Sequence, residues 1–113
     1  MREIEIPLPR SADCLLVGKT IEEICISSGL RVALKASLSK FSGSTHWHLK
    51  HGDDRGTLEV TLWPAKHRAW FSIQDGRIGA WIEKKTAQLQ DSFQRAFQNH
   101  APNTALEPTP TAP

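Results

Sequence analysis

The chain has 113 residues, of which 39% are hydrophobic and 23% charged, and its formal net charge is +2. This composition is typical of one soluble globular domain, and the mild charge falls short of the clustered basic charge of nucleic-acid-binding domains. The chain has no run of 18 apolar residues, so no membrane span is predicted. Its N-terminal segment lacks the apolar core of an export signal. We therefore expect a single cytoplasmic domain over residues 1–100 and a disordered Pro- and Thr-rich tail over residues 101–113.

The first predicted element is an alternating segment with Ile4, Ile6 and Leu8 on one side. Pro7 and Pro9 lack a backbone N–H group, so if this segment is a strand, it lies at the edge of a sheet. Two cysteines are too few for a disulfide framework, and both stand among apolar residues. We expect them to be reduced and partly buried.

A short helix is predicted next, over about three turns from Thr20 to Gly29. The Thr20 hydroxyl can cap the helix, and Glu22 and Glu23 favour the positive end of the helix dipole. Residues 12–17 before it predict a separate turn that Gly18 ends. Gly29 is typical of the residue that follows a helix.

Four strands with period-two alternation follow between residues 31 and 74. Their connections are short and rich in turn-forming residues, so we expect neighbouring strands to pair antiparallel as hairpins. The predicted strands are Arg31–Lys40, Thr45–His51, Thr57–Trp63 and Arg68–Gln74.

The alternation predicts which residues face the core and how the strands align. Loops of four residues would set Leu38 opposite Trp47, Trp47 opposite Val60 and Val60 opposite Phe71, and a slip of one residue would set apolar against polar side chains. The predicted core-facing residues are Val32, Leu34, Ala36, Leu38, Trp47, Leu49, Leu58, Val60, Leu62, Ala69, Phe71 and Ile73.

After residue 77 the apolar period becomes helical, which predicts a helix of about 18 to 20 residues. Its apolar stripe comprises Ile78, Ile82, Leu89, Phe93, Ala96 and Phe97. The sequence thus predicts an α+β fold with a short N-terminal helix, a four-stranded antiparallel β-meander and a long C-terminal helix packed on one sheet face.

The other sheet face is predicted to be open and to bear tryptophan, histidine and charged residues. Glu59 would lie opposite His48, and Arg68 would lie over Trp63. Two exposed tryptophans forfeit burial energy, so we expect a second copy of the chain to cover them, with the N-terminal segment or a ligand as alternatives. The predicted interface residues are Trp63, Trp70, His46, His48, Glu59 and Arg68, with Lys35 and Lys50 on the same face.

An alternative function uses the two histidines. His46 and His48 point the same way along one strand, and Glu59 could complete a metal site or orient His48 as a general base, with Ser37 or Ser72 in the same row. The segment His46-Trp47-His48 resembles the HxH motif of cupin barrels, but the glycine and glutamate spacing of that motif is absent. The prediction therefore assigns no cofactor, no metal and no catalytic residue, and keeps a small-molecule-binding protein or small enzyme as the alternative.

A third function class is a single-stranded nucleic-acid binder, since an open sheet with aromatic and basic side chains can stack bases. Trp63 and Trp70 lack the glycine–aromatic signature of RNA-recognition sheets, so nucleic acid is a disfavoured partner. A homodimer is the preferred prediction.

The terminal residues 103–113, NTALEPTPTAP, resemble the translated end of an integron gene cassette. The resemblance implies a small bacterial protein encoded by a mobile gene cassette, and proteins of this kind are often oligomeric. It covers the tail alone and implies nothing about the fold.

Overall fold

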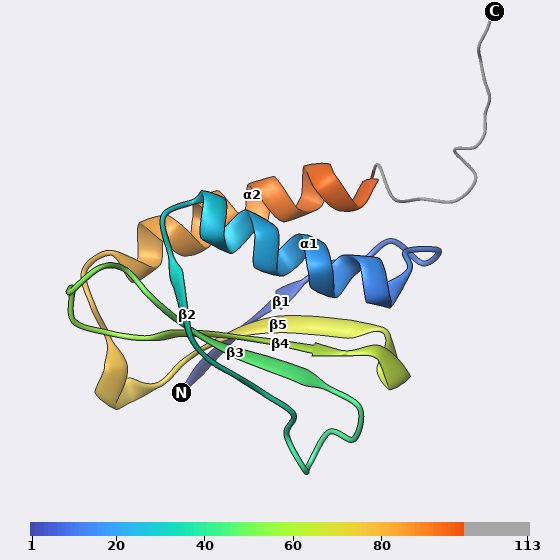
Figure 1. The fold of residues 1–113 in the computed structure, drawn as a ribbon, viewed down its shortest axis with the longest axis horizontal. Coiled ribbons are helices and arrows are strands. Elements are labelled where there is room, and N and C mark those ends of the chain that lie inside the picture. The colour runs from blue at the N-terminus through green and yellow to red at the C-terminus, as the bar shows by residue number, and fades with distance from the viewer. Residues whose placement is uncertain (99–113) are drawn as a thin grey trace, which may run out of the picture.

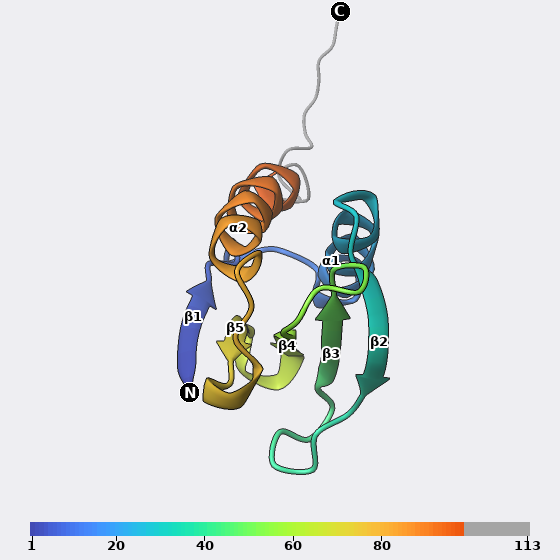
Figure 2. The same ribbon diagram turned by 90° about the vertical axis from the view of Figure 1, so that its left-hand side faces the viewer.

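The computed structural model describes residues 1–98, so the predicted tail over 101–113 lies outside the described residues. The described part is an α+β fold in which two helices cover one face of an antiparallel sheet (Figures 1 and 2). The sheet order is β1-β5-β4-β3-β2. Its strands are β1 (Arg2–Ile6), β2 (Arg31–Ala36), β3 (Thr45–Lys50), β4 (Leu58–Trp63) and β5 (Arg68–Ile73). Among the described residues, no helix is long and apolar enough to cross a membrane.

The sheet has five strands, so the prediction of four strands was one short. The alternating N-terminal segment forms β1, which pairs with β5 at the edge of the sheet, with Ile4 opposite Phe71 and Ile6 opposite Ala69. Pro7 follows the last paired residue, and its missing N–H group is the physical reason that the strand ends there.

The N-terminal helix is longer than predicted. Helix α1 runs from Cys14 to Ser27 as one element, and Asp13 caps it by accepting the Leu15 N–H at 3.0 Å. Gly18 lies inside the helix and does not end a turn. A Cβ atom at Gly18 would lie 3.2 Å from Leu62 Cδ2, so the glycine stands where the helix runs close to the sheet.

Two of the three predicted hairpin registers are confirmed. Trp47 lies opposite Val60, and Val60 lies opposite Phe71. The register of β2 is wrong, because Trp47 pairs with Lys35 and not with Leu38. The connection between β2 and β3 spans residues 37–44 and is twice as long as the loop that the prediction assumed.

An irregularity in β2 reverses the two faces of that strand. The register shifts between Val32, which faces Leu49, and Leu34, which faces His48. Leu34 and Ala36 therefore lie on the face with the histidines, against the prediction, and Lys35 lies on the helix side. An extra residue of this kind displaces every side chain after it to the opposite face.

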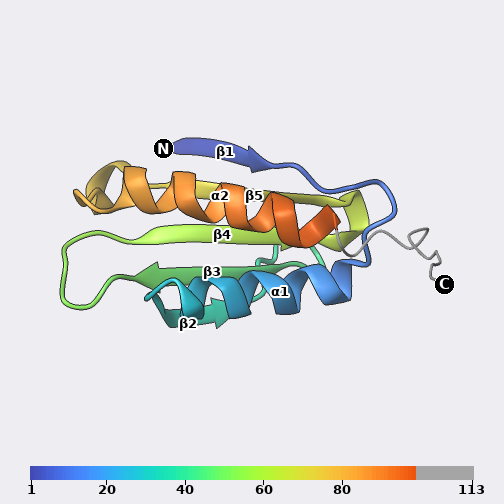
Figure 3. The same cartoon turned by 90° about the horizontal axis from the view of Figure 1, so that it is seen from above.

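The core lies between the sheet and the two helices. Helix α2 (Ile82–Gln98) buries Ile82, Leu89, Phe93 and Phe97. Ile78 was predicted to belong to this stripe, but it precedes the helix and is exposed, because residues 75–77 form a short 3₁₀ helix, η2. Seen from above, α2 lies along β5 and β4 and α1 along β3 and β2 (Figure 3).

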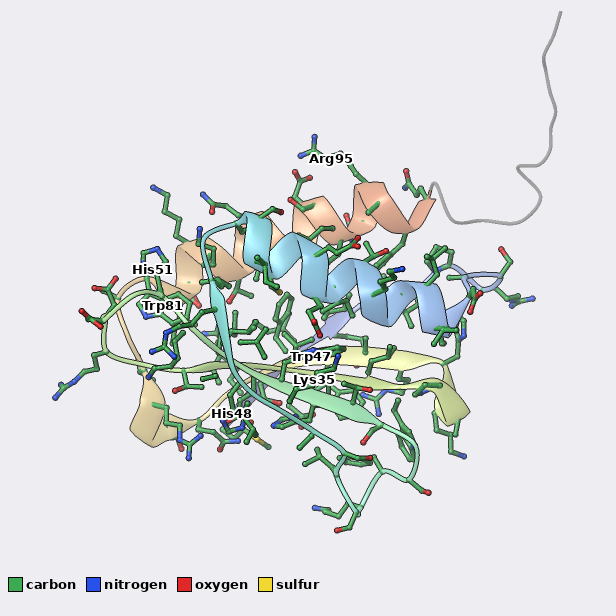
Figure 4. The ribbon with its side chains drawn as sticks, in the orientation of Figure 1. Lys35, Trp47, His48, His51, Trp81 and Arg95 are labelled. Carbon is green, nitrogen blue, oxygen red and sulfur yellow. The ribbon has the colours of Figure 1, made fainter. Side chains whose placement is uncertain are left out.

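Glu22 on α1 joins the helix to the sheet. Its Oε1 accepts the Trp47 Nε1–H group at 2.9 Å and lies 2.8 Å from Lys35 Nζ; Figure 4 places Trp47 and Lys35 beneath α1. The hydrogen bond with Lys35, and then that with Trp47, lowers the pKa of Glu22 below its usual value of 4.5.

This lowered pKa predicts a pH-dependent contribution of Glu22 to stability. A carboxylate with a depressed pKa stabilises the fold above its unfolded pKa, and the effect is lost as the pH falls through the folded pKa. We expect Glu22→Gln to lower the free energy of unfolding at pH 7 by up to about 1 kcal/mol, since the pair is partly exposed. Urea unfolding should show this difference shrinking below pH 4.5; an unchanged difference at low pH would contradict the assignment.

Candidate functional site

Three side chains that can bind a cation meet on the sheet face away from the helices. Strand β3 contributes His46 and His48, and β4 contributes Glu59, which pairs directly with His48 as predicted. Figure 4 shows His48 below the sheet and Trp47, one residue earlier, between the sheet and α1. The strict alternation of a strand places the two imidazoles on the same side.

The donor atoms of these three residues converge. The two Nε2 atoms of His46 and His48 lie 3.2 Å apart, and His46 Nε2 lies 3.3 Å from Glu59 Oε1. His48 Nε2 lies 3.9 Å from Glu59 Oε2. One donor atom from each residue falls within a group no wider than 4.8 Å.

The site is largely shielded from water. His46 and Glu59 are buried, and His48 is half-buried. Burial lowers the pKa of His46, and the charge of Glu59 opposes that effect only in part. His46 is therefore neutral at pH 7, which is the form of the imidazole that binds metal ions.

Hydrogen bonds around the cluster determine which ring nitrogens carry protons. Arg77 Nη1 lies 3.4 Å from His48 Nδ1 and can only donate, so His48 Nδ1 accepts and His48 Nε2 carries its proton. That proton points to His46 Nε2, which leaves the His46 proton on Nδ1, 2.7 Å from Thr61 Oγ1. This assignment is inferred from the hydrogen-bond pattern. It turns the His46 Nε2 lone pair toward the cluster.

A polar cavity of about 420 Å³ opens beside the cluster and is lined by His48, Glu59, Gln74, Gly76 and Arg77. Arg77 Nη1 lies 3.5 Å from Glu59 Oε2, and Gln74 Nε2 lies 3.4 Å from Glu59 Oε1. Arg77 is half-exposed, so its guanidinium can move within the cavity. The cavity thus has a cationic wall and is accessible from solvent on the side of His48.

The predicted aromatic patch is covered by the chain itself. Trp70 is only 3% exposed. Phe41, from the loop between β2 and β3, makes an edge contact with it at 5.3 Å between ring centroids, and Arg68 lies 4.6 Å from its ring centroid. The guanidinium thus lies over Trp70 and not over Trp63, where it was predicted, although Arg68 and Trp63 do pair across the strands.

Trp63 keeps partial exposure and donates its Nε1–H to the Ser42 carbonyl at 3.1 Å. Self-association through this face stays a prediction, and so does nucleic-acid binding. Both rested on two uncovered indoles, and the same loop now contacts both of them. Leu34, in edge strand β2, is an exposed apolar residue on this face.

The sequence-based prediction missed or misplaced several residues of the site. Ser72 lies opposite Glu59 as predicted, but Ser37 does not join that row, since its hydroxyl donates to the Ser44 carbonyl in the loop. Gln74 and Arg77 were not singled out. Gln74 directly follows β5, and the alternation of the strand places it on the same face as Ser72, so the sequence pattern could have identified it. Arg77 lies in the irregular segment η2, where no such pattern exists.

Comparisons of the chain with protein-family models, with curated proteins and with solved structures find no match.

Proposed function

We propose that the chain binds a divalent metal ion of the zinc class through His46, His48 and Glu59. The observation that carries this proposal is the convergence of three donor atoms from three side chains within 4.8 Å. Zinc binds two histidines and one carboxylate in open sites, with a water or a ligand in the fourth position.

The separations between the donor atoms suit such an ion. With metal–ligand bonds of about 2.0–2.1 Å and tetrahedral angles, neighbouring donor atoms lie about 3.3 Å apart. The His46–His48 and His46–Glu59 separations are 3.2 and 3.3 Å. His48 Nε2 lies 3.9 Å from the other carboxylate oxygen of Glu59, Oε2, and His48 is half-buried.

The electrostatics of the cluster also call for a cation. The His48 Nε2 proton lies between the two imidazoles, and the buried Glu59 carboxylate receives only long contacts from Arg77 at 3.5 Å and Gln74 at 3.4 Å. A metal ion would take the place of the His48 Nε2 proton and neutralise the carboxylate directly. A single shared proton bridges two of these atoms at a time, whereas one metal ion contacts all three. The Thr61 hydroxyl supports the His46 ring from behind, as the outer-shell partners of metal-binding histidines do.

The cavity beside the cluster indicates the kind of ligand that the metal would hold. Its wall carries Arg77, and the fourth position of the metal would face the same space. A metal ion and a guanidinium together favour a small anion such as a carboxylate or phosphate. A metal-bound water in that position would be activated for hydrolysis of such a molecule.

Equilibrium dialysis against Zn²⁺, and Co²⁺ absorption spectra, test the metal site. We expect one equivalent bound per chain. Loss of one ligand in His48→Ala or Glu59→Gln should weaken binding by more than the roughly 10–100-fold that loss of an outer-shell partner costs. Glu59→Gln keeps the shape of the side chain and removes its charge.

His51→Ala is the matched control, because His51 also lies beside a carboxylate, at 2.7 Å from Asp54 Oδ2, but outside the cluster. This variant should bind metal as the natural chain does. An equal loss of metal affinity in His51→Ala, or unchanged affinity in Glu59→Gln, would contradict the proposal. The cluster would then be an ordinary hydrogen-bonded group of cross-strand side chains.

A further inference from the structure

A second pair of reactive side chains lies at the other end of the sheet, apart from the proposed metal site. Cys14 is the first residue of α1, and His67 follows the short 3₁₀ helix η1 (Pro64–Lys66) in the turn between β4 and β5. Cys14 Sγ lies 3.6 Å from His67 Nδ1. On the far side of the ring, His67 Nε2 lies 2.8 Å from the Pro9 carbonyl oxygen.

The Pro9 carbonyl determines which nitrogen of the neutral His67 ring carries the proton. A carbonyl oxygen only accepts hydrogen bonds, so His67 Nε2 carries the proton and the Nδ1 lone pair of the neutral ring faces Cys14. The thiol therefore donates to Nδ1. A nucleophile, a base within reach and a third group that orients the base form the arrangement used for covalent catalysis.

The backbone conformation at His67 maintains this orientation. His67 has φ 52°, and it is the non-glycine residue with positive φ among residues 1–98. Left-handed backbone is uncommon outside glycine, and it is tolerated best by asparagine, aspartate and histidine. Asparagine is therefore the substitution that removes the imidazole while keeping the turn.

Cys14 needs its base in order to react. Burial first, and then the charge of Asp13, raise the pKa of the Cys14 thiol. At neutral pH it is protonated, so attack on an electrophile requires transfer of the proton to His67 as the new bond forms. The second cysteine offers a natural comparison, because Cys25 is 1% exposed and burial raises its pKa to about 12.

Cys14 lies at one end of an apolar groove between α1 and the sheet. The groove has a volume of about 820 Å³, and its lining is mainly apolar, with Leu15, Ile26, Trp47 and Leu62 among its residues. Its charged residues are Lys19, Glu22, Glu23 and Lys35. Gly18 lets α1 run close to the sheet in this wall of the groove, since a Cβ atom at this position would lie 3.2 Å from Leu62 Cδ2. Leu15 is 85% exposed and Ile26 is also exposed, so an apolar ligand would cover surface that water now contacts.

We propose that Cys14 accepts an apolar acyl group from a thioester, with the acyl chain lying in this groove. Cys14 Sγ attacks the carbonyl carbon and passes its proton to His67 Nδ1. The bond from that carbon to the leaving sulfur then breaks, and the leaving thiolate takes the proton from His67. One thioester is consumed and one is formed, so the step needs no oxidant, reductant or other co-reactant.

Octanoyl-coenzyme A and intact-protein mass spectrometry test this assignment. We expect one octanoyl group per chain, placed on Cys14 by peptide mapping, none in Cys14→Ala, and normal acylation in Cys25→Ala. His67→Asn should slow acylation by about 10²–10⁴-fold, the usual contribution of a positioned base. An unchanged acylation rate in His67→Asn, with only a lower melting temperature, would assign His67 a structural role and overturn the proposal.

The groove is tested separately with Ile26→Lys, which would place a charge in its apolar lining at a side chain that is exposed and so can be replaced without loss of core packing. This variant should keep its helical circular dichroism and react with iodoacetamide, a small probe of the Cys14 thiol, but should lose octanoylation. Octanoylation that persists in Ile26→Lys, an adduct on Cys25, or no adduct on the natural chain would each contradict the inference. Because the metal ligands are untouched, these outcomes are independent of the proposed metal site.

Discussion

Zinc at about a thousand times its dissociation constant should raise the melting temperature of the protein by about 15 °C or more. A ligand that binds only the folded state at that excess adds about 4 kcal/mol to the free energy of unfolding, and each 1 kcal/mol shifts the midpoint of a domain of this size by about 4–8 °C. The ligands come from two strands and meet only when β3 and β4 are paired.

Differential scanning fluorimetry with and without Zn²⁺ measures this shift, and EDTA should reverse it. Glu59→Gln should show little or no rise, whereas His51→Ala should rise as the natural chain does. Zinc that binds the cysteines or histidines of the unfolded chain would reduce the shift equally in all three proteins. A rise of the same size in Glu59→Gln would therefore place the metal elsewhere.

The second large effect is expected at Gly79, where two backbone segments cross. A Cβ atom at Gly79 would lie 1.8 Å from the Arg55 carbonyl oxygen. Because this oxygen belongs to the backbone, a change of side-chain rotamer cannot remove the clash. Gly56, with φ 108°, lies on the other side of the same crossing. The Thr57 N–H donates to the Arg77 carbonyl at 2.9 Å, and the Trp81 indole N–H donates to the Arg55 carbonyl at 2.8 Å.

We expect Gly79→Ala to lower the free energy of unfolding by about 1–3 kcal/mol or more, as overpacking of a close contact does. The displaced segment carries Arg77, so the variant should also disturb the cationic wall of the cavity beside His48. Urea denaturation and metal titration measure the two effects.

Gly76→Ala is the matched control, because a Cβ atom there meets nothing within 4 Å although Gly76 lines the same cavity. Its stability and metal affinity should stay close to those of the natural chain. If Gly79→Ala and Gly76→Ala behave alike, the crossing does not position Arg77.

The proposed metal site was within reach of the sequence because β3, β4 and β5 are regular. Their alternation has period two, and the turns between them are short, so a slip of one residue would have buried polar side chains. The register therefore follows from the pattern, and with it the pairing of His48 with Glu59. The same register placed Trp70 on the sheet face away from the helices.

The alignment of β2 could not be obtained in the same way. Leu34, Ala36 and Leu38 continue an apolar alternation that looks core-facing, but the strand changes phase after Val32 and stops at Ala36. The remaining residues form the loop that places Phe41 against both tryptophans. A local pattern carries no information about where this loop packs, because its ring contacts with Trp63 and Trp70 join residues more than 20 positions apart.

By itself, the sequence determined the α+β class, the helix-covered face of the sheet and the cluster of His46, His48 and Glu59. These features depend on the periodicities of the strands and helices and on the short turns that set the register between neighbouring strands. Only the tertiary structure decided that Arg77 joins this cluster and that His67 meets Cys14, 53 positions away along the chain. Those contacts arise where irregular segments cross, and their positions depend on packing between elements, which no repeat in the sequence records.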